Sequence, residues 1–421
     1  MNQVAKTIAL AAALLLSAPG VLAADLLIQN VKIINGSDAD SHAATDILIQ
    51  GDSVTNIGKG LSAPEGVSVV DGTNKVVTSG LFNASTQLGL VEVGAVADTD
   101  DASSDNMHIT ASLRVIDAFN PSSVLIPHNR MHGVTHSLIQ PQSNAGLFAG
   151  TAAVVNLGDT GNIEVSDAAM VVTLGQNGSK LAGGSRAAAM AQLREAIEDA
   201  RDYARNKASY NRGDRRNYRL SRHDLEALVP VVQRRLPLLV NVERAADIER
   251  VLQFAKEYNL TLILSGVSEG WRVADKIAAA KVPVIFDPIY NLPSSYETLG
   301  ARLDNAKILD QAGVTIMFTG MGWQSSHNAY LVRQSAGNAV ANGLPYQKAI
   351  QAITSNPAKI FGLPGYGEVK KGAKASLVLW SGDPLELTSA PEIVLINGKN
   401  YDLVSRSTQL RDRYFKRLQA K

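Results

Sequence analysis

The 421-residue sequence contains no cysteine, so it can form no disulfide bond, offers no thiolate to a metal ion and has no residue that could carry a lipoprotein anchor. It also lacks an excess of either charge, because 40 basic residues face 39 acidic ones and the formal net charge is +1. This balance argues against nucleic acid or an anionic lipid surface as a partner. We therefore expect the fold to depend on a large hydrophobic core.

Long apolar runs are also missing, apart from a short one at the N-terminus. Lys6 precedes the apolar run 8–16, the helix breakers Pro19 and Gly20 follow it, and small residues surround Ala23. This order is typical of a secretory signal peptide cut after Ala23, and the run is too short to serve as a membrane anchor. We expect residues 1–23 to be removed and the mature protein to be periplasmic or secreted.

Two hydrophobic patterns divide the remaining chain. Short alternating segments with Asn-Gly, Gly-Asp and Asp-Gly turns fill residues 24–78, and similar segments fill 365–421, which predicts one small β-sandwich built from both ends. Residues 79–364 instead repeat an apolar strand followed by an amphipathic helix. This rhythm predicts an α/β fold with a TIM-like (β/α)8 barrel, and an open doubly wound sheet is the alternative. The clearest strands are predicted at 238–241, 260–264, 282–286 and 314–318.

One helical segment near 181–226 interrupts the rhythm, and its second half, 206–222, is crowded with arginines. Charge runs are usually solvated faces, so a surface insertion is one interpretation. The alternative is a lid over the barrel mouth whose arginines contact an anionic substrate.

Three segments resemble the amidohydrolase superfamily, especially its imidazolonepropionase-like branch. They run from Val77-Thr78-Ser79-Gly80-Leu81 to Gly89, from Ala349 to Ala358 through Thr354-Ser355-Asn356-Pro357, and from Gly372-Ala373-Lys374-Ala375 to Pro384. The resemblance implies a (β/α)8 barrel carrying a composite β-sandwich. It also implies hydrolysis of C–N bonds by one or two divalent metals at the barrel mouth. Barrels of this family are often dimers, so we expect a homo-oligomer.

The same resemblance locates the metal-ligand positions, and none of them holds a good ligand here. Ser85 and Gln87 stand where the first strand of the family ends in His-x-His, a spacing that works because residues two apart on a strand point the same way. The other positions match Asn241, Gly266 or its neighbour Ser265, and Gly320 or Met321, while a metal-bridging lysine would fall near Asn156. These side chains offer neither imidazole nor carboxylate, so we expect no metal cofactor.

Polar residues near the predicted strand ends are the remaining site candidates. We predict catalytic roles for Glu243, Glu269 and His327, and substrate contacts from Gln87, Asn156, Asn241, Arg244 and Trp271. The alternative is that His327 and Glu269 simply begin helices, where an acidic side chain is favourable on its own. The spacing of His128, His132 and His136 also allows a replacement metal site, although this stretch is predicted to lie away from the mouth.

Two functions follow from these residues. The first is a divergent or inactive amidohydrolase that binds a small molecule or a partner, such as a paralogous amidohydrolase subunit. The alternative is an active hydrolase of cyclic amide or peptide-like compounds that uses a carboxylate or histidine base. A purely structural protein is a third class, which the long barrel loops disfavour.

Overall fold

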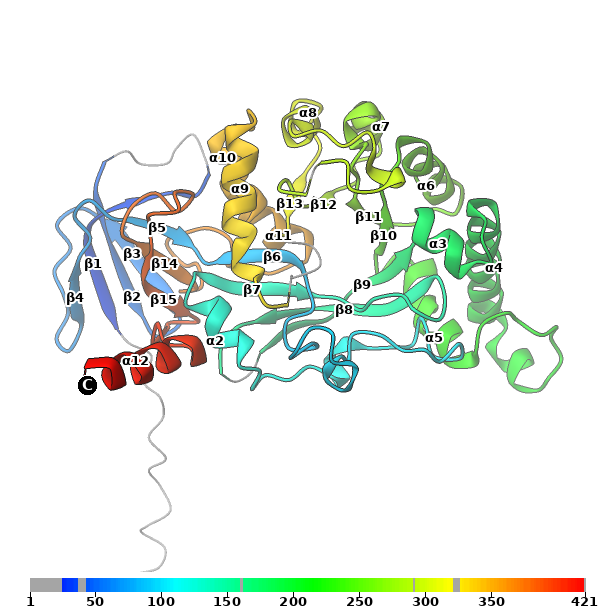
Figure 1. The fold of residues 1–421 in the computed structure, drawn as a ribbon, viewed down its shortest axis with the longest axis horizontal. Helices are drawn as coiled ribbons and strands as arrows, with labels where there is room; N and C mark the ends of the chain where they lie inside the picture. The colour runs from blue at the N-terminus through cyan, green and yellow to red at the C-terminus, as the bar shows by residue number, and fades with distance from the viewer. Residues whose placement is uncertain (1–24, 37–42, 160–161, 291, 321–325, 420–421) are drawn as a thin grey trace, which may run out of the picture.

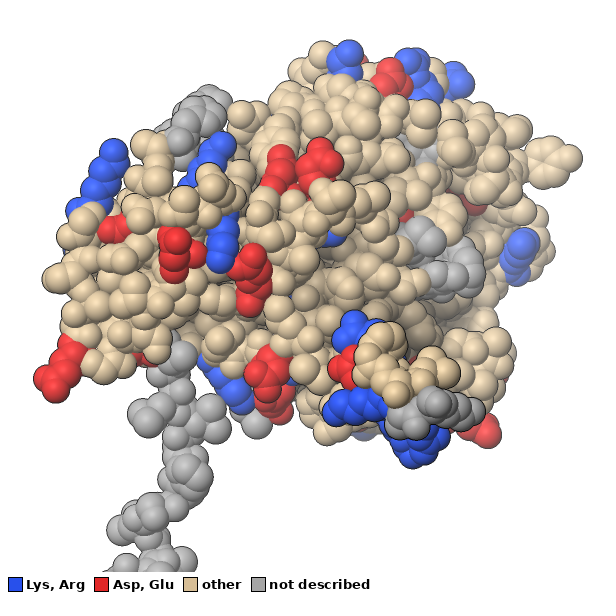
Figure 2. Space-filling view, turned by 60° about the vertical axis from the view of Figure 1, so that its left-hand side comes forward, with Lys and Arg blue, Asp and Glu red and all other residues tan. Residues whose placement is uncertain are grey.

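The computed structural model describes residues 25–36, 43–159, 162–290, 292–320 and 326–419. The predicted signal peptide at 1–23 lies outside these residues, and so do Met321 and the C-terminal two residues. Among the described residues, no helix combines the length and the apolar character needed to cross a bilayer. Basic and acidic side chains alternate over the face shown in Figure 2, without a large field of one sign.

Strands from both ends of the chain share one eight-stranded sheet (Figure 1). The first half of β1 pairs with β2 and β4, and its second half pairs with β5, so the sheet folds over a buried apolar cluster. C-terminal β14 runs antiparallel to β5 and continues the sheet to β15 and β16. The strands are β1 (Leu26–Ile33), β2 (Thr45–Gln50), β3 (Ser53–Gly58), β4 (Ser68–Asp71), β5 (Val76–Ser79), β14 (Leu377–Trp380), β15 (Pro391–Ile396) and β16 (Lys399–Tyr401).

The second sheet is the predicted barrel, which is confirmed. Its eight strands follow the chain order, and the last lies against the first. The Thr319 hydroxyl donates to the Ser85 carbonyl at 2.7 Å across this closure. The strands are β6 (Leu81–Thr86), β7 (Val134–Ile139), β8 (Phe148–Asn156), β9 (Ile163–Thr173), β10 (Leu238–Val242), β11 (Leu262–Gly266), β12 (Val284–Phe286) and β13 (Ile316–Phe318).

One strand departs from the all-parallel arrangement. β8 runs antiparallel to both β7 and β9, so these three strands form a meander, whereas every other neighbouring pair of the order is parallel. Helices cover the outside of the barrel (Figure 1). They are α2 (Leu125–Arg130), α3 (Gly175–Leu181), α4 (Arg186–Asn211), α5 (Arg222–Val232), α6 (Ala245–Glu257), α7 (Ala274–Ala279), α8 (Asn305–Gln311), α9 (Val332–Ala341), α10 (Tyr346–Ala352) and α11 (Ser355–Ile360), while α12 (Arg406–Gln419) ends the described chain beside the sandwich.

The interior of the barrel explains where the functional side chains lie. Alternate residues of each strand point inward, and the inward ones form a separate apolar cluster that includes Leu239, Ile263 and Ile285. Their neighbours, such as Leu238 and Val240, pack outward against the helices. A polar residue placed two positions after the last inward apolar residue therefore lies at the barrel mouth.

Candidate functional site

Six strands follow this two-residue rule and build one layer of polar side chains at the mouth. Gln140 follows Leu138, Thr173 follows Val171, Asn241 follows Leu239, Ser265 follows Ile263, Asp287 follows Ile285 and Thr319 follows Met317. We call these six residues the rim layer. All six line one cavity of about 620 Å³, the mouth cavity, together with Ser85, Glu243 and Lys180. Its size is that of a small-molecule site.

The rim layer does not fit the metal ions that the family uses. Its members are one carboxylate, two amides and three hydroxyls, with no imidazole. Within the described part of the chain, no group of three or more His, Cys, Asp or Glu side chains is placed to hold a metal ion. Zinc requires about four such nitrogen, sulfur or carboxylate ligands in a tight tetrahedron, and the rim layer does not supply them.

The two positions that match His-x-His make hydrogen bonds to other amides. The Ser85 hydroxyl accepts from the Gln140 amide at 2.5 Å, and the Gln87 amide donates to the Gln142 carbonyl oxygen at 3.4 Å. Ser85 lines the mouth cavity, and Gln87 supports its wall through Gln142. At the sixth strand, the inward residue is Ser265, one of the two alternatives that the sequence left open.

Gln140 carries an unpaired acceptor at the cavity. Its side-chain nitrogen is used by Ser85, whereas its side-chain oxygen is buried and has no hydrogen-bond partner among the described residues. A buried oxygen without a donor costs free energy, which a rotation of the side chain toward a donor bound in the cavity would recover. The sequence analysis missed Gln140, and also Asp287 and Lys180, because none of them matches a family motif. The two-residue rule would have found the first two.

Glu243 and Asp287 are the two carboxylates of the mouth-cavity lining, and Glu243 has a shifted pKa. One of its oxygens accepts from the Ser268 amide at 3.0 Å and from the Ser268 hydroxyl at 2.6 Å. Burial raises the pKa of Glu243 above its usual value, and nearby Glu297 raises it further, while the two Ser268 hydrogen bonds lower it. Gly266 makes room for this carboxylate, since a Cβ at that position would lie 2.3 Å from its Oε1.

Glu269 and Trp271 lie outside the mouth cavity, which corrects their predicted roles. The Glu269 carboxylate accepts from the Ala245 amide at 3.0 Å, so it satisfies a free N–H at the start of α6. The Trp271 indole donates to the Gly300 carbonyl at 2.7 Å. Its ring also lies between the guanidinium groups of Arg272 and Arg302, at 4.5 and 4.7 Å. Both residues therefore stabilise segments that lie outside the mouth cavity.

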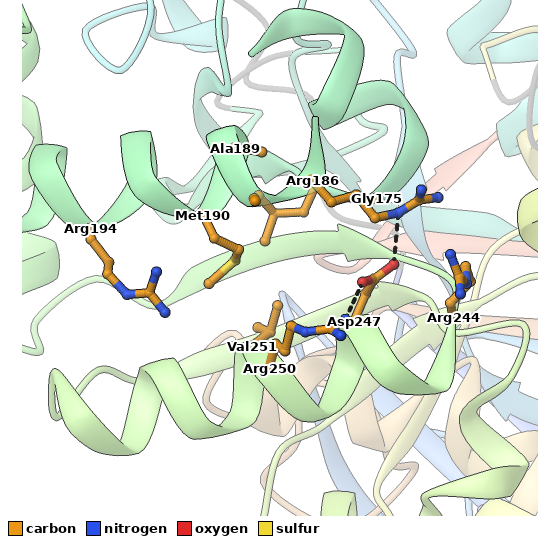
Figure 3. Close-up of a pocket in the computed structure, with 11 residues that line it drawn as sticks. Gly175, Arg186, Ala189, Met190, Arg194, Arg244, Asp247, Arg250 and Val251 are labelled. Carbon is orange, nitrogen blue, oxygen red and sulfur yellow. Dashed lines mark hydrogen bonds and ion pairs between the residues drawn. The ribbon is translucent and has the colours of Figure 1, made fainter. Parts of the chain in front are cut away.

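Asn156, His327 and Arg244 also lie elsewhere. The prediction that Asn156 lines the mouth is wrong because β8 is antiparallel, so the end of that strand pairs with His136 near the beginning of β7, on the opposite face of the barrel. His327 contacts its neighbour Ser326 and accepts from Asn129 through its carbonyl, and it does not line the mouth cavity. Arg244 lines a second pocket on the outer side of the barrel (Figure 3).

The three histidines of the alternative metal site do not converge on one point. The His132 ring stacks on Tyr330 with centroids 4.3 Å apart, and His128 meets both rings at their edges. His136 lies deep under the barrel against Tyr366, where burial lowers its pKa to about 3. These contacts indicate structural roles.

The arginine-rich segment folds back on its own helix and is therefore no lid. Arg215 pairs with Asp202, Arg216 with the fully buried Asp199, and Arg219 with Glu195, all on α4. No residue of 206–222 lines the mouth cavity. The surface-insertion interpretation agrees with this placement.

Comparison with known proteins finds similarity to amidohydrolases. The family model described as "Amidohydrolase family" matches residues 241–404. An amidohydrolase from Thermotoga maritima has the same fold, with a TM-score of 0.79 and 23% identity over 90% of this chain and 99% of that one. The chain therefore shares its fold with an amidohydrolase, and its C-terminal part matches the amidohydrolase family model.

More distant proteins share the barrel as well. A prolidase crystallised with N-methylphosphonate-L-proline gives a TM-score of 0.54 at 14% identity over 90% of this chain and 99% of that one. Atrazine chlorohydrolase from Arthrobacter aurescens, complexed with zinc, gives a TM-score of 0.51 at 14% identity over 94% of this chain and 99% of that one. The amidohydrolase tasK of Hapsidospora irregularis is 23% identical over 88% of this chain. The chain spans only 42% of the length of that relative.

Proposed function

We propose that this protein is a divergent amidohydrolase of the periplasm that binds a neutral, polar small molecule in its mouth cavity without a metal ion. The observation that carries the proposal is the buried, unpaired side-chain oxygen of Gln140, which calls for an N–H or O–H donor. The amide and hydroxyl groups of the rim layer around it suit a ligand with amide-like edges. A partner subunit that supplies the missing chemistry is compatible with this proposal.

Glu243 favours one alternative, metal-independent hydrolysis of a cyclic amide. Its raised pKa brings the carboxyl group closer to the range in which a general acid or base is effective. The carboxylate would take a proton from a water molecule that attacks the amide carbon. It would then return the proton to the departing nitrogen as the C–N bond breaks.

Binding measurements with cyclic amides test the proposal. Hydantoin and dihydrouracil serve as probes, titrated into the mature protein by calorimetry. We expect Gln140→Leu to weaken binding about fivefold, because one net hydrogen bond contributes about 1 kcal/mol. Gln253→Leu is the matched control, since Gln253 is exposed on α6 far from the rim. Equal affinity of wild type and Gln140→Leu would contradict the proposal.

Product analysis separates the two functions. The same probes are incubated with wild type and with Glu243→Gln, after treatment with a chelator. Turnover by wild type that disappears in Glu243→Gln would establish the hydrolase alternative. Binding without turnover supports the proposal.

A further inference from the structure

A second pocket lies outside the barrel wall, between α4 and α6 (Figure 3). Its volume is about 450 Å³, and its lining shares no residue with the mouth cavity. The two are separated by the loops that follow β9 and β10, since Thr173 and Glu243 face the mouth while the next residues, Leu174 and Arg244, face the outer pocket. A ligand here would therefore be distinct from one at the mouth.

The outer pocket is strongly cationic. Arg186, Arg194, Arg244 and Arg250 line it, and Asp247 is the single acidic residue of its lining. The charge of these five groups is +3. Glu297, which accepts from Arg186 at 3.3 Å from outside the lining, lowers it to +2. Most protein surfaces intersperse opposite charges, so this concentration of arginines is unusual.

Two of the four arginines are already engaged and two are not. Asp247 accepts from Arg186 at 3.1 Å and from Arg250 at 2.9 Å, which fixes those side chains on the pocket wall. The guanidinium groups of Arg194 and Arg244 make no hydrogen bond or ion pair with the described part of the protein. A guanidinium group presents paired N–H donors that match a carboxylate in a bidentate way.

The two free arginines lie at opposite ends of the outer pocket. Figure 3 shows Arg194, on α4, at one end and Arg244, at the start of α6, at the other. The apolar side chains of Met190 and Val251 lie between them on the side of Arg194, and the ion-paired Asp247 lies between these two and Arg244. This arrangement presents one cation at each end of a surface whose middle is apolar on one side and charge-compensated on the other.

We propose that the outer pocket binds an elongated dianion with two carboxylate groups joined by a short apolar spacer. One carboxylate meets Arg194 and the other meets Arg244, while the spacer covers Met190 and Val251. Two negative charges balance the +2 that remains after Asp247 and Glu297 are counted. A compact anion such as phosphate can reach only one of the two ends, so the geometry favours a dicarboxylate over a single oxyanion.

Calorimetric titration of the mature protein at low ionic strength tests this proposal. The probes are glutarate, adipate and suberate, which differ in spacer length, with hexanoate and inorganic phosphate for comparison. We expect one diacid to bind at least tenfold more tightly than hexanoate and phosphate. Arg194→Gln and Arg244→Gln should each reduce its affinity at least tenfold, to the level of the monocarboxylate.

Two controls keep the result interpretable. Arg205→Gln removes an exposed arginine of the same helix that lies outside the pocket, so its affinity should stay within twofold of wild type. Gln140→Leu alters only the mouth cavity, so it should leave diacid binding unchanged and separates this proposal from the proposed function. Unchanged melting temperatures show that the variants fold. Equal binding of diacid and hexanoate, equally tight phosphate, or an equal loss in Arg205→Gln would overturn the proposal.

Discussion

Replacing Gly266 by alanine should disturb the mouth through one identifiable contact. Gly266 ends β11 with φ +91°, a conformation that alanine adopts at a cost of about 1–2 kcal/mol. The new Cβ would lie 2.3 Å from Oε1 of Glu243 and 2.7 Å from its Cδ, so the carboxylate must move by about 1 Å. That shift weakens its two hydrogen bonds from Ser268, worth about 1.5–3 kcal/mol for a charged acceptor. We expect a total loss of about 2.5–5 kcal/mol.

Urea unfolding of matched variants measures the two parts separately. Gly183→Ala is the backbone control, because Gly183 has φ +88° and nothing within 4 Å of its added Cβ. It should cost about 1–2 kcal/mol. Gly266→Ala should destabilise the wild-type protein more than Gly183→Ala does, because of the clash with Glu243. In a Glu243→Ala background this additional loss of unfolding free energy should disappear, so that Gly266→Ala costs no more than the control. The reasoning is refuted if Gly266→Ala and Gly183→Ala cost the same in the wild-type background, or if the excess persists without the Glu243 carboxylate.

Four further outcomes are expected. Because the pKa of Glu243 is raised in the folded protein, the unfolded chain binds fewer protons, and wild type loses stability as pH rises above the usual carboxyl range. The melting temperature of Glu243→Gln relative to that of wild type should therefore be higher at pH 8 than at pH 4. The same difference at both pH values would contradict this prediction. The pKa of His136 is lowered to about 3 in the folded protein, so the unfolded chain takes up a proton first and stability falls as pH drops from 6.5 to 3. The melting temperature of His136→Gln should fall less steeply over this pH range than that of wild type. An equal slope for the two proteins would argue against this prediction. Asp224 is fully buried and accepts hydrogen bonds from the backbone and hydroxyl groups of Thr110 and Ser112. Asp224→Ala should therefore lower the free energy of unfolding, measured in urea, by about 3 kcal/mol or more. A loss below about 1 kcal/mol would contradict this role of the network. Elemental analysis of protein purified without chelator should find no stoichiometric zinc-class metal, and one ion per chain would show that the ligand assignment is wrong.

The sequence was sufficient for the barrel because apolar runs fix buried strands. The four predicted strands at 238–241, 260–264, 282–286 and 314–318 lie within two residues of those observed. The direction of β8 was not predictable, since an antiparallel strand buried on both faces shows the same continuous apolar pattern as a parallel one. Because β8 runs antiparallel to its neighbours, Asn156 lies at the end of the barrel opposite the mouth.

Only part of the candidate site could be predicted from the sequence. The residues that could be placed correctly are those on strands. Asn241 and Ser85 sit on strands, whose period of two determines where a side chain points. Glu269 and Trp271 belong to a single 3-10 turn after β11, which is too short to show a period. A carboxylate or an indole there can equally well cap α6 or pack against arginines. Roles on loops depend on contacts that only the folded chain reveals.

The barrel core does not depend on which polar side chains stand in the rim layer. Below the rim layer, the inward side chains of the strands form their own apolar cluster, and the outward side chains form another with the helices. Neither cluster requires the rim residues to be imidazole or carboxylate. The rim can therefore carry amides and hydroxyls in place of imidazoles and carboxylates while the strands keep their positions and the pocket keeps its shape.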